Sequence, residues 1–269
     1  MFFKEKQCEK CGKYYDEMQD FCPSCLEENS LYKDEKKKHQ MLWLPIKDQL
    51  FNFLIGFFGL NIITIIVTIF LAGVYNNNQP LGLMLINTIS YVLVFIGLLA
   101  YNFSCHLKGY FIKYFKDKEA YLFGIFMAVV LLTLSTLCSI FADGLFPNQV
   151  GGNQNAAVDL VNSYPVISLL VLGFLGPIVE ELTYRVGLFN FMARTKRWIA
   201  YLVEVLVFAL LHFDFSGNLL LELANLPAYL VAGLVLTYTY EKKGPAASMT
   251  AHIINNVFSV ITIILAVKL

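Results

Sequence analysis

From residue 50 onwards, long apolar runs alternate with short polar breaks along the chain. Most runs approach the roughly 20 residues that a helix needs to cross the hydrocarbon core of a bilayer. The pattern predicts seven membrane-spanning helices, near 51–74, 83–104, 120–142, 165–192, 198–213, 219–240 and 246–267. The fifth run is short, and glycine or proline interrupts the fourth and the sixth, at Gly173, Gly176, Pro177 and Pro227. Such helices persist in lipid only where neighbouring helices or a cavity satisfy the freed backbone groups.

The first 48 residues have the opposite character. They hold nine of the twenty Lys and Arg and ten of the twenty Asp and Glu, although the whole chain is 57% hydrophobic and only 15% charged. Soluble domains are about one quarter charged, so the composition favours a membrane protein. The pattern divides the chain into a polar head (1–28), a charged linker (29–48) and a transmembrane domain (49–269). The head lacks the apolar core and cleavage site of a signal peptide, so we expect the first apolar run to be an uncleaved anchor.

The head contains the segment "CEKCGKYYDEMQDFCPSC", which forms two CxxC knuckles. Their four thiolates, from Cys8, Cys11, Cys22 and Cys25, suit a tetrahedral structural Zn²⁺ site. A pair of disulfides is the alternative, and it requires an oxidising compartment. The segment resembles the short zinc ribbons at the N-terminus of many bacterial membrane proteins. The expected fold class is therefore all-α, a polytopic membrane helix bundle of about seven spans with a small N-terminal zinc ribbon. Cys105 and Cys138 lie in or beside apolar runs and are expected to be packing residues.

Basic residues are distributed unequally between the two sets of connections. Counted over the alternate connections and the linker, fourteen Lys and Arg fall on one side of the predicted bundle, and Lys268 alone falls on the other. The positive-inside rule makes the rich side cytoplasmic, which predicts a multi-pass protein of the plasma membrane with a cytoplasmic N-terminus. Thiols stay reduced there, which favours zinc over disulfides. The linker lysines could contact anionic lipid headgroups, or the linker could be a solvated spacer.

A few ionisable or strongly polar side chains interrupt the fourth, fifth and seventh runs. They are Glu180, Glu181, Arg185, Glu204, His212, His252 and Asn256. Such side chains inside a span are expensive to insert, and they indicate a functional site that faces the interior of the bundle. Glu181 and Arg185 are four residues apart and can pair on one helix face. Glu180 lies about 100° around the helix from Glu181, so it is expected to face a different partner. Glu204 could line a polar path, although it is close enough to the cytoplasmic end to snorkel.

Glu180, His212 and His252 together provide the groups that amide hydrolysis needs. One carboxylate and two imidazoles in a dry cavity could hold a divalent metal ion or polarise a water molecule directly. Each residue also has a structural interpretation, because membrane His and Asn side chains commonly form hydrogen bonds between helices. The Glu181–Arg185 pair could likewise be a buried structural ion pair. The set as a whole, on three separate spans, favours catalysis.

The segments "EELTYR", "FALLH" and "HIINN" resemble the EExxxR, FxxxH and HxxxN motifs of the CPBP family. This family comprises CAAX-protein endopeptidases and bacteriocin-processing or self-immunity proteins, and the resemblance covers about residues 165–267. It implies that Glu180 activates water, that His212 and His252 are catalytic or hold an active-site metal such as Zn²⁺, and that Asn256 completes the site. Glu181 and Arg185 would support it. The family often has a glycine directly after the motif arginine, which aids close helix packing. Here Val186 stands between Arg185 and Gly187, one position later.

The resemblance implies an intramembrane metallopeptidase that cleaves a membrane-associated peptide or protein from a site open to the cytoplasmic side. The sequence lacks the HExxH, GxSxG and GxGD motifs of other intramembrane proteases. A non-proteolytic regulator or scaffold, such as a sensor-kinase partner or a bacteriocin-immunity protein, remains the alternative, and a transporter is a third. The expected partners are the lipid bilayer, the substrate and a cytoplasmic or membrane protein bound through the ribbon, with no nucleic acid.

Overall fold

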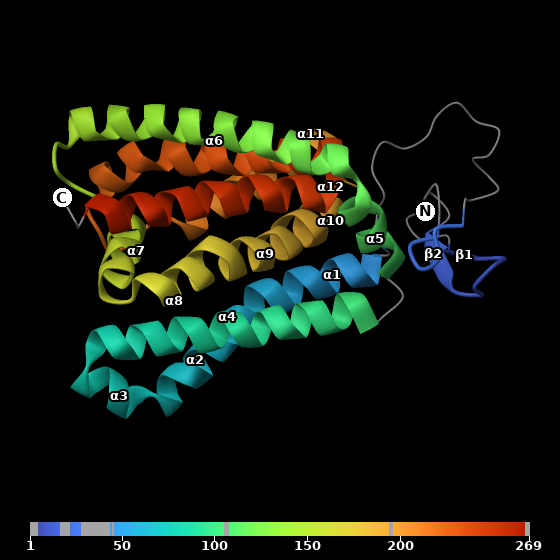
Figure 1. Ribbon diagram of the computed structural model, residues 1–269, viewed down its shortest axis with the longest axis horizontal. Helices are drawn as coiled ribbons and strands as arrows, with labels where there is room; N and C mark the ends of the chain where they lie inside the picture. Colours follow the sequence, from blue (N-terminus) through green and yellow to red (C-terminus); the bar gives the residue numbers. More distant parts are fainter. Residues whose placement is uncertain are drawn as a thin grey trace.

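The computed structural model of the chain describes residues 5–16, 22–27, 44, 46–104, 108–193 and 196–266. Cys105 and most of the charged linker therefore lie outside the described residues. The described part consists of a small N-terminal ribbon beside one end of a helical bundle (Figure 1). The predicted class, an all-α membrane bundle with a four-cysteine head, is confirmed.

The ribbon consists of two short antiparallel strands and two cysteine knuckles. Strand β1 (Glu5–Gln7) pairs with β2 (Tyr14–Asp16), with Lys6 opposite Tyr15. The turn between the strands contains Gly12 at φ 69°, a backbone conformation that glycine adopts without strain. Tyr15 packs against buried Cys8 and Cys22, and these side chains make up the core of the ribbon. So small a core cannot stabilise a fold alone, which is typical of a metal-dependent module.

The helices of the bundle follow in chain order. They are α1 (Ile46–Leu54), α2 (Leu60–Phe70), α3 (Ala72–Asn77), α4 (Gln79–Ser104), α5 (Lys108–Lys116), α6 (Lys118–Leu145), α7 (Gly152–Ser163), α8 (Pro165–Leu170), α9 (Gly176–Glu180), α10 (Asn190–Ala193), α11 (Arg197–Leu211) and α12 (Leu219–Ala266). Three π-helical segments, η2 (Ile55–Gly59), η3 (Val171–Leu175) and η4 (Glu181–Phe189), join their neighbours into longer helices. Such π-helical turns are frequent at functional sites.

Within the described residues, five helical stretches are long and apolar enough to cross a membrane: Ile46–Phe70, Gln79–Phe103, Lys118–Leu145, Pro165–Ala193 and Leu219–Ala266. The first four correspond to the first four predicted spans. The fifth predicted span is α11, which has only 15 residues. The sixth and seventh predicted spans are the two arms of α12, which meet at a break at Gly244 (φ 75°, ψ −170°). The described part of the chain thus has five candidate spans where seven were predicted, because α11 is short and two of the predicted spans are the arms of one stretch.

The chain reverses direction at Gly244. Just before the break, Lys243 forms an ion pair with Glu119 at the start of α6, near the ribbon (Figure 1). The beginning of α12, at Glu222, instead contacts the start of α7 at the opposite end of the bundle. Helix α6 packs along α12, and Gly124 permits the approach, because a Cβ there would lie 2.5 Å from the carbonyl oxygen of Ala247.

A second close approach fixes the helix that carries the EELTYR motif. Gly187, displaced by one position from the family pattern, lies against α1, where a Cβ would meet the backbone nitrogen of Phe53 at 2.7 Å. Larger residues would force the two helices apart. Gly187 therefore provides the close packing expected of the motif glycine, in spite of the intervening Val186.

Within the helical bundle, the structure brings the described basic positions other than Arg185 to the ribbon end. They are Lys47, Lys108, Lys113, Lys116, Lys118, Lys196, Arg197, Lys242 and Lys243, at or next to helix ends on that side (Figure 1). The connections at the other end, 71–78, 146–164 and 212–218, contain no Lys or Arg. The bundle therefore has one basic and one non-basic end.

This polarity gives a labelling prediction. In a background with Cys105 and Cys138 replaced by serine, cysteines placed at Asn77 or Asn153 should react with an impermeant maleimide added to intact cells. Cysteines placed at Lys116 or Lys196 should react only after the membrane is opened, because basic loops stay in the cytoplasm. The reverse pattern would overturn the expected orientation.

Candidate functional site

A buried ion-pair network lies at the centre of the bundle. The Arg185 guanidinium is shared between two carboxylates, with its Nη1 3.1 Å from Glu181 Oε1 and its Nε 3.1 Å from Glu204 Oε1. All three side chains are completely buried. The hydroxyl of Thr237 donates a hydrogen bond to the second oxygen of Glu204. The network therefore connects η4, α11 and α12 through charged groups that cannot separate without exposing an unpaired charge.

His252 lies between the two adjacent glutamates of the motif. Its Nδ1 is 2.9 Å from Glu181 Oε1, a hydrogen bond in which the imidazole donates to the carboxylate. Its Nε2 is 3.7 Å from Glu180 Oε2, too far for a direct hydrogen bond. Glu181 thus fixes the orientation of His252. The Glu180 side chain, 17% exposed, instead faces the cavity described below. The predicted difference between the two glutamates is present in their contacts.

Phe208, the first residue of the FALLH segment, packs against several groups of the site. The Arg185 guanidinium carbon lies 4.6 Å from the centre of its ring, a cation–π contact. The His212 and His252 rings lie 4.6 and 6.1 Å from it. His212 ends α11, and its Nδ1 is 2.8 Å from the carbonyl oxygen of Phe208. Because that carbonyl can only accept, Nδ1 carries the hydrogen, which leaves Nε2 of the neutral ring as an acceptor.

A cavity of about 260 Å³ joins the predicted catalytic residues. Glu180, His212, His252 and Asn256 all line it. Asn256 donates a hydrogen bond to the carbonyl oxygen of Leu172, 3.0 Å away in the π-helical segment η3. The structure therefore brings four of the six predicted site residues to one space, and Glu181 and Arg185 lie behind it as supporting groups.

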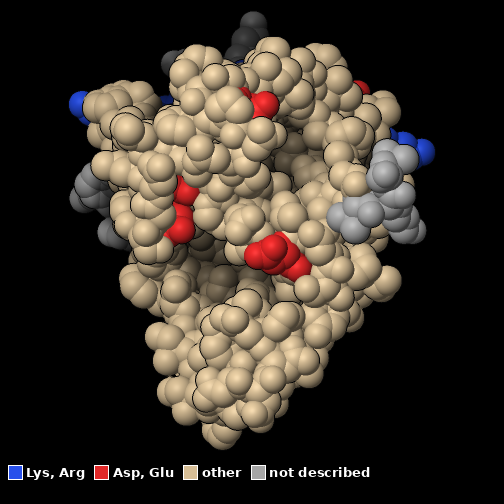
Figure 2. Space-filling model, turned by 90° about the vertical axis from the view of Figure 1, so that its left-hand side faces the viewer, with Lys and Arg blue, Asp and Glu red and all other residues tan. Residues whose placement is uncertain are grey.

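The cavity belongs to the end of the bundle that is far from the ribbon. Helix α7, which lies at that end, contributes Asn153, Gln154 and Ala157 to its wall (Figure 1). Figure 2 views the molecule from this end and shows the face hollowed between acidic groups, with Lys and Arg only at the margins. A site open to the ribbon side, expected from the sequence, is therefore not what the structure shows. The reason is α7, a helix in a stretch where the hydropathy pattern predicts only a connection between spans.

Three further contacts hold α7 and His212 in place. The phenol ring of Tyr229 stacks on the His212 ring, with centroids 4.9 Å apart and an angle of 24°. Asn153 of α7 donates a hydrogen bond to the Tyr229 hydroxyl. Glu222 accepts a hydrogen bond from the backbone N–H of Gly152 at 2.7 Å, at the first residue of α7. Neither Tyr229 nor Glu222 belongs to a motif, so only the three-dimensional arrangement reveals them.

Glu204 is the main correction to the sequence interpretation. Sequence position suggested a side chain near the cytoplasmic end that could snorkel, whereas the structure buries it completely against Arg185 and Thr237. Its charge could have been recognised as an interior one, because Glu204 precedes Phe208 by four residues and so shares its helix face.

The membrane site does not fit a metal ion as its residues stand. Within the described ranges, the four cysteines are the only group of three or more His, Cys, Asp or Glu side chains with ligand atoms close enough to hold one. Glu180, His212 and His252 line the same cavity without reaching this mutual proximity. The predicted active-site metal therefore has no preformed ligand set here.

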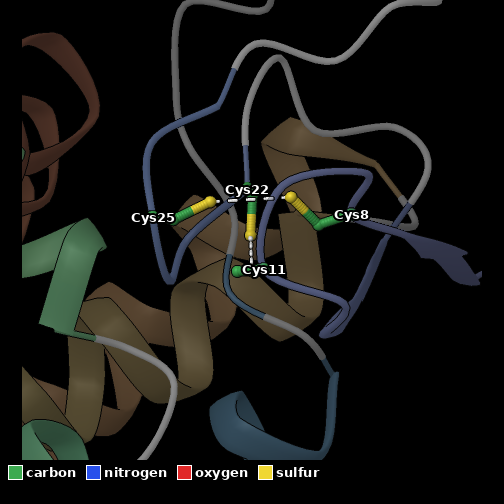
Figure 3. A group of neighbouring side chains, drawn as sticks. All are labelled: Cys8, Cys11, Cys22 and Cys25. Atoms are coloured by element: carbon green, nitrogen blue, oxygen red, sulfur yellow. Dashed lines mark hydrogen bonds between the residues drawn. The ribbon is translucent and has the colours of Figure 1, made fainter.

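The ribbon cysteines, by contrast, fit a metal well (Figure 3). Their four sulfur atoms lie within 4.8 Å of one another, with Cys8 and Cys25 3.5 Å apart and Cys11 and Cys22 3.6 Å apart. A tetrahedron with Zn–S bonds of about 2.3 Å has edges of about 3.8 Å, close to these distances. Burial raises the pKa of the Cys22 thiol to about 12. Metal binding therefore has to displace a proton from it.

Comparison with known proteins finds a family similarity in the C-terminal part of the bundle. Residues 162–258 match the family model described as Type II CAAX prenyl endopeptidase Rce1-like. This segment contains all three motifs, so the predicted resemblance to the CPBP family is confirmed. The family is one of membrane proteases.

Three curated relatives are similar to parts of the chain. UPF0177 protein YvdC of Lactococcus lactis subsp. lactis is 27% identical over 133 residues, 49% of this chain and 49% of the relative. UPF0177 protein YxdF of the same organism is 30% identical, over 32% of this chain and 44% of the relative. An uncharacterized protein of Mycoplasma capricolum subsp. capricolum is 26% identical, over 72% of this chain and 60% of the relative. The chain thus spans about half the length of the first two relatives, and no solved structure matches it.

Proposed function

We propose that the chain is an intramembrane endopeptidase that hydrolyses a peptide bond of a membrane-associated peptide or protein with a water molecule activated by Glu180. One observation carries the proposal: Glu180, His212, His252 and Asn256, from three separate helices, line a single cavity inside a protease-family segment. A purely structural set of polar residues would have no reason to surround an accessible space.

The contacts suggest a role for each group. Glu180 would accept a proton from water as the water oxygen attacks the carbonyl carbon of the substrate. His212, with Nε2 free as an acceptor, could share in orienting that water. The amide N–H of Asn256 would donate to the oxyanion that forms, and Nε2 of His252 would do so when both of its ring nitrogens carry hydrogen, since Glu181 accepts the Nδ1 hydrogen. Collapse of the intermediate breaks the C–N bond, and the proton held by Glu180 passes to the leaving amine.

Arg185 would support this chemistry from behind the cavity wall. By pairing with Glu181 and Glu204, it offsets the negative charge of these two carboxylates in a poorly hydrated place. Ionised Glu181 is the acceptor that orients His252. The charged residues of the EExxxR motif thus have separate tasks, since Glu180 acts on water, while Glu181 and Arg185 position the imidazole.

The substrate side follows from the polarity of the bundle. If the basic, ribbon end is cytoplasmic, the cavity faces the outer half of a plasma membrane, because α7 forms part of its wall. The substrate would then present its scissile bond at or near the outer leaflet. The ribbon would hold one structural Zn²⁺ in the cytoplasm. It would also bind a cytoplasmic or membrane partner protein.

The four-cysteine site yields a metal prediction. Full-length protein should copurify with one Zn²⁺ per chain, and replacing Cys22 and Cys25 together with serine should remove it, because two remaining thiolates cannot complete a tetrahedron. Cys138→Ser is the matched control and should keep the full zinc content. Elemental analysis of the purified variants gives the zinc content per chain. A wild-type protein without zinc would refute the proposed zinc site.

Profiling of protein termini tests the protease function. Membranes from cells that express the wild type should contain new N-termini that are absent from cells expressing Glu180→Gln at equal abundance. The same termini in both would mean that the wild type does not generate them through this site. A phenotype that persists in Glu180→Gln without any new terminus would favour the non-proteolytic regulator instead.

A further inference from the structure

The second cysteine knuckle of the ribbon lies against the start of α5. The backbone N–H of Tyr110 donates a hydrogen bond to the carbonyl oxygen of Pro23, 2.8 Å away. Tyr110 is the third residue of α5, and the first four N–H groups of a helix have no acceptor within it. The ribbon therefore supplies a partner that the helix itself cannot provide.

Gly109 makes this contact possible. A Cβ at that position would lie 2.4 Å from the carbonyl oxygen of Pro23 and 2.8 Å from the carbonyl carbon of Ser24. Both are backbone atoms between Cys22 and Cys25, so they cannot move aside as the end of a flexible side chain could. Any larger residue at 109 would push the knuckle off α5.

The opposite face of α5 contacts the interior of the membrane domain. The hydroxyl of buried Tyr110 is 2.7 Å from that of Tyr240, which also accepts a hydrogen bond from Asn190 at 2.7 Å. Tyr114 lies against the break in α12, where a Cβ on Gly244 would be 2.1 Å from its ring. Helix α5 therefore contacts the ribbon through Tyr110 and the break at Gly244 through Tyr114. Figure 1 shows α5 between the ribbon and the rest of the bundle.

The two arms of α12 carry different parts of the site. Asn190 directly follows the π-helical segment with Glu181 and Arg185, and Tyr240 is near the end of the first arm. The second arm begins after Gly244 and carries His252 two turns later. The position of the break consequently affects where His252 meets the glutamates.

We propose that the ribbon is a metal-dependent intramolecular clamp, which docks on α5 through its second knuckle and thereby holds the break at Gly244 in place. A bound metal fixes the backbone of both knuckles, and without it the Pro23 carbonyl has no fixed position. Whether the four-cysteine site holds its metal would in this way determine how well ordered the second arm of α12 is, and this arm carries His252. This proposal does not depend on whether the membrane site cleaves peptides, because hydrogen exchange tests it without an activity measurement.

Hydrogen exchange of the full chain in lipid nanodiscs tests the clamp. In zinc-loaded protein, the amides of Tyr110 and of residues 241–248 should be protected. After zinc is removed with a chelator, both sets should exchange at least about tenfold faster, since each loses its support. Rates that do not change on removal of zinc would overturn the proposal.

Two glycines provide matched variants. Gly109→Ala and Gly97→Ala each add one methyl group inside a helix, but a Cβ at Gly97 meets nothing within 4 Å. With zinc bound at one per chain, Gly109→Ala should reproduce the fast exchange of zinc-free protein, and Gly97→Ala should match the wild type. Wild-type rates in Gly109→Ala would overturn docking on α5.

Tyr110→Phe distinguishes docking of the ribbon on α5 from the effect of α5 on the break at Gly244. This variant keeps the N–H that binds Pro23 and removes the hydroxyl that contacts Tyr240. The amide at 110 should stay protected, while residues 241–248 should exchange several-fold faster. If residues 241–248 of Tyr110→Phe exchange at the wild-type rate, the clamp is refuted. This test holds even if Gly109→Ala is too unstable to purify.

Discussion

Glu180→Gln should abolish cleavage while the protein still inserts and folds. Glutamine keeps the size of the side chain but cannot accept a proton from water, and the loss of a general base lowers kcat by about 100- to 10,000-fold. Glu180 faces the cavity, and the ion pairs of Arg185 are with Glu181 and Glu204, so the charge of Glu180 is not needed to hold the helices together. Rates of formation of the new termini, measured beside detergent melting curves, check both parts.

The matched control is Glu119→Gln, which removes a surface carboxylate that pairs with Lys243. It should cleave like the wild type. His212→Ala and His252→Ala should be folded but inactive, as Glu180→Gln is. If Glu180→Gln unfolds the protein while Glu181→Gln only abolishes activity, the roles of the two glutamates are reversed.

Arg185→Met should be the most destabilising single change in the membrane domain. It leaves Glu181 and Glu204 buried without a counter-ion, and removal of one partner from a buried ion pair costs about 3–5 kcal/mol in the free energy of unfolding. Glu181→Gln alone should cost less, because Arg185 keeps Glu204 as a partner. Thermal unfolding of the purified variants in one detergent gives the comparison.

Arg197→Met is the matched control for this effect. Arg197 pairs with Glu241 while its side chain is 62% exposed, so its loss should change the stability by only about 0–1 kcal/mol. Replacing Glu181 and Glu204 with glutamine in the Arg185→Met background should recover part of the loss, since no charge is then left unpaired. If Arg185→Met unfolds at the same temperature as the wild type, the ion-pair network has no structural role.

The membrane bundle and the motif residues could be predicted because both depend on local patterns. Runs of apolar residues define spans directly, and the spacing of Glu181 and Arg185 places them on one helix face. The two knuckles predicted the cysteine cluster for the same reason, as each CxxC pair is close in space by its own geometry. Such features need no knowledge of how distant segments meet.

The rest depends on contacts between distant segments. Glu204 meets Arg185 only because α11 packs beside η4, and the sequence offers Glu204 several equally plausible partners. The amphipathic segment 152–163 has too little apolar character to be read as part of a cavity wall, yet α7 contributes to it. The direction in which the site opens was therefore beyond the hydropathy pattern.

The break at Gly244 illustrates a third kind of limit. Glycine followed by proline predicts an interruption, but not that α5 would pack against it through Tyr114. That contact depends on the side-chain arrangement of a short helix between two spans. Local chemistry thus predicts where a helix breaks, and tertiary packing decides what holds the break.

Hydrolysis in ¹⁸O-labelled water tests the role of Glu180 most directly. Purified protein in lipid vesicles would be incubated with the membrane proteins whose new termini appear in expressing cells, and the fragments analysed by mass spectrometry. If Glu180 activates water, the wild type should release fragments whose new carboxyl terminus carries one ¹⁸O atom, and Glu180→Gln should release none. Fragments that form at the same rate with Glu180→Gln, or no fragments with the wild type, would contradict the mechanism.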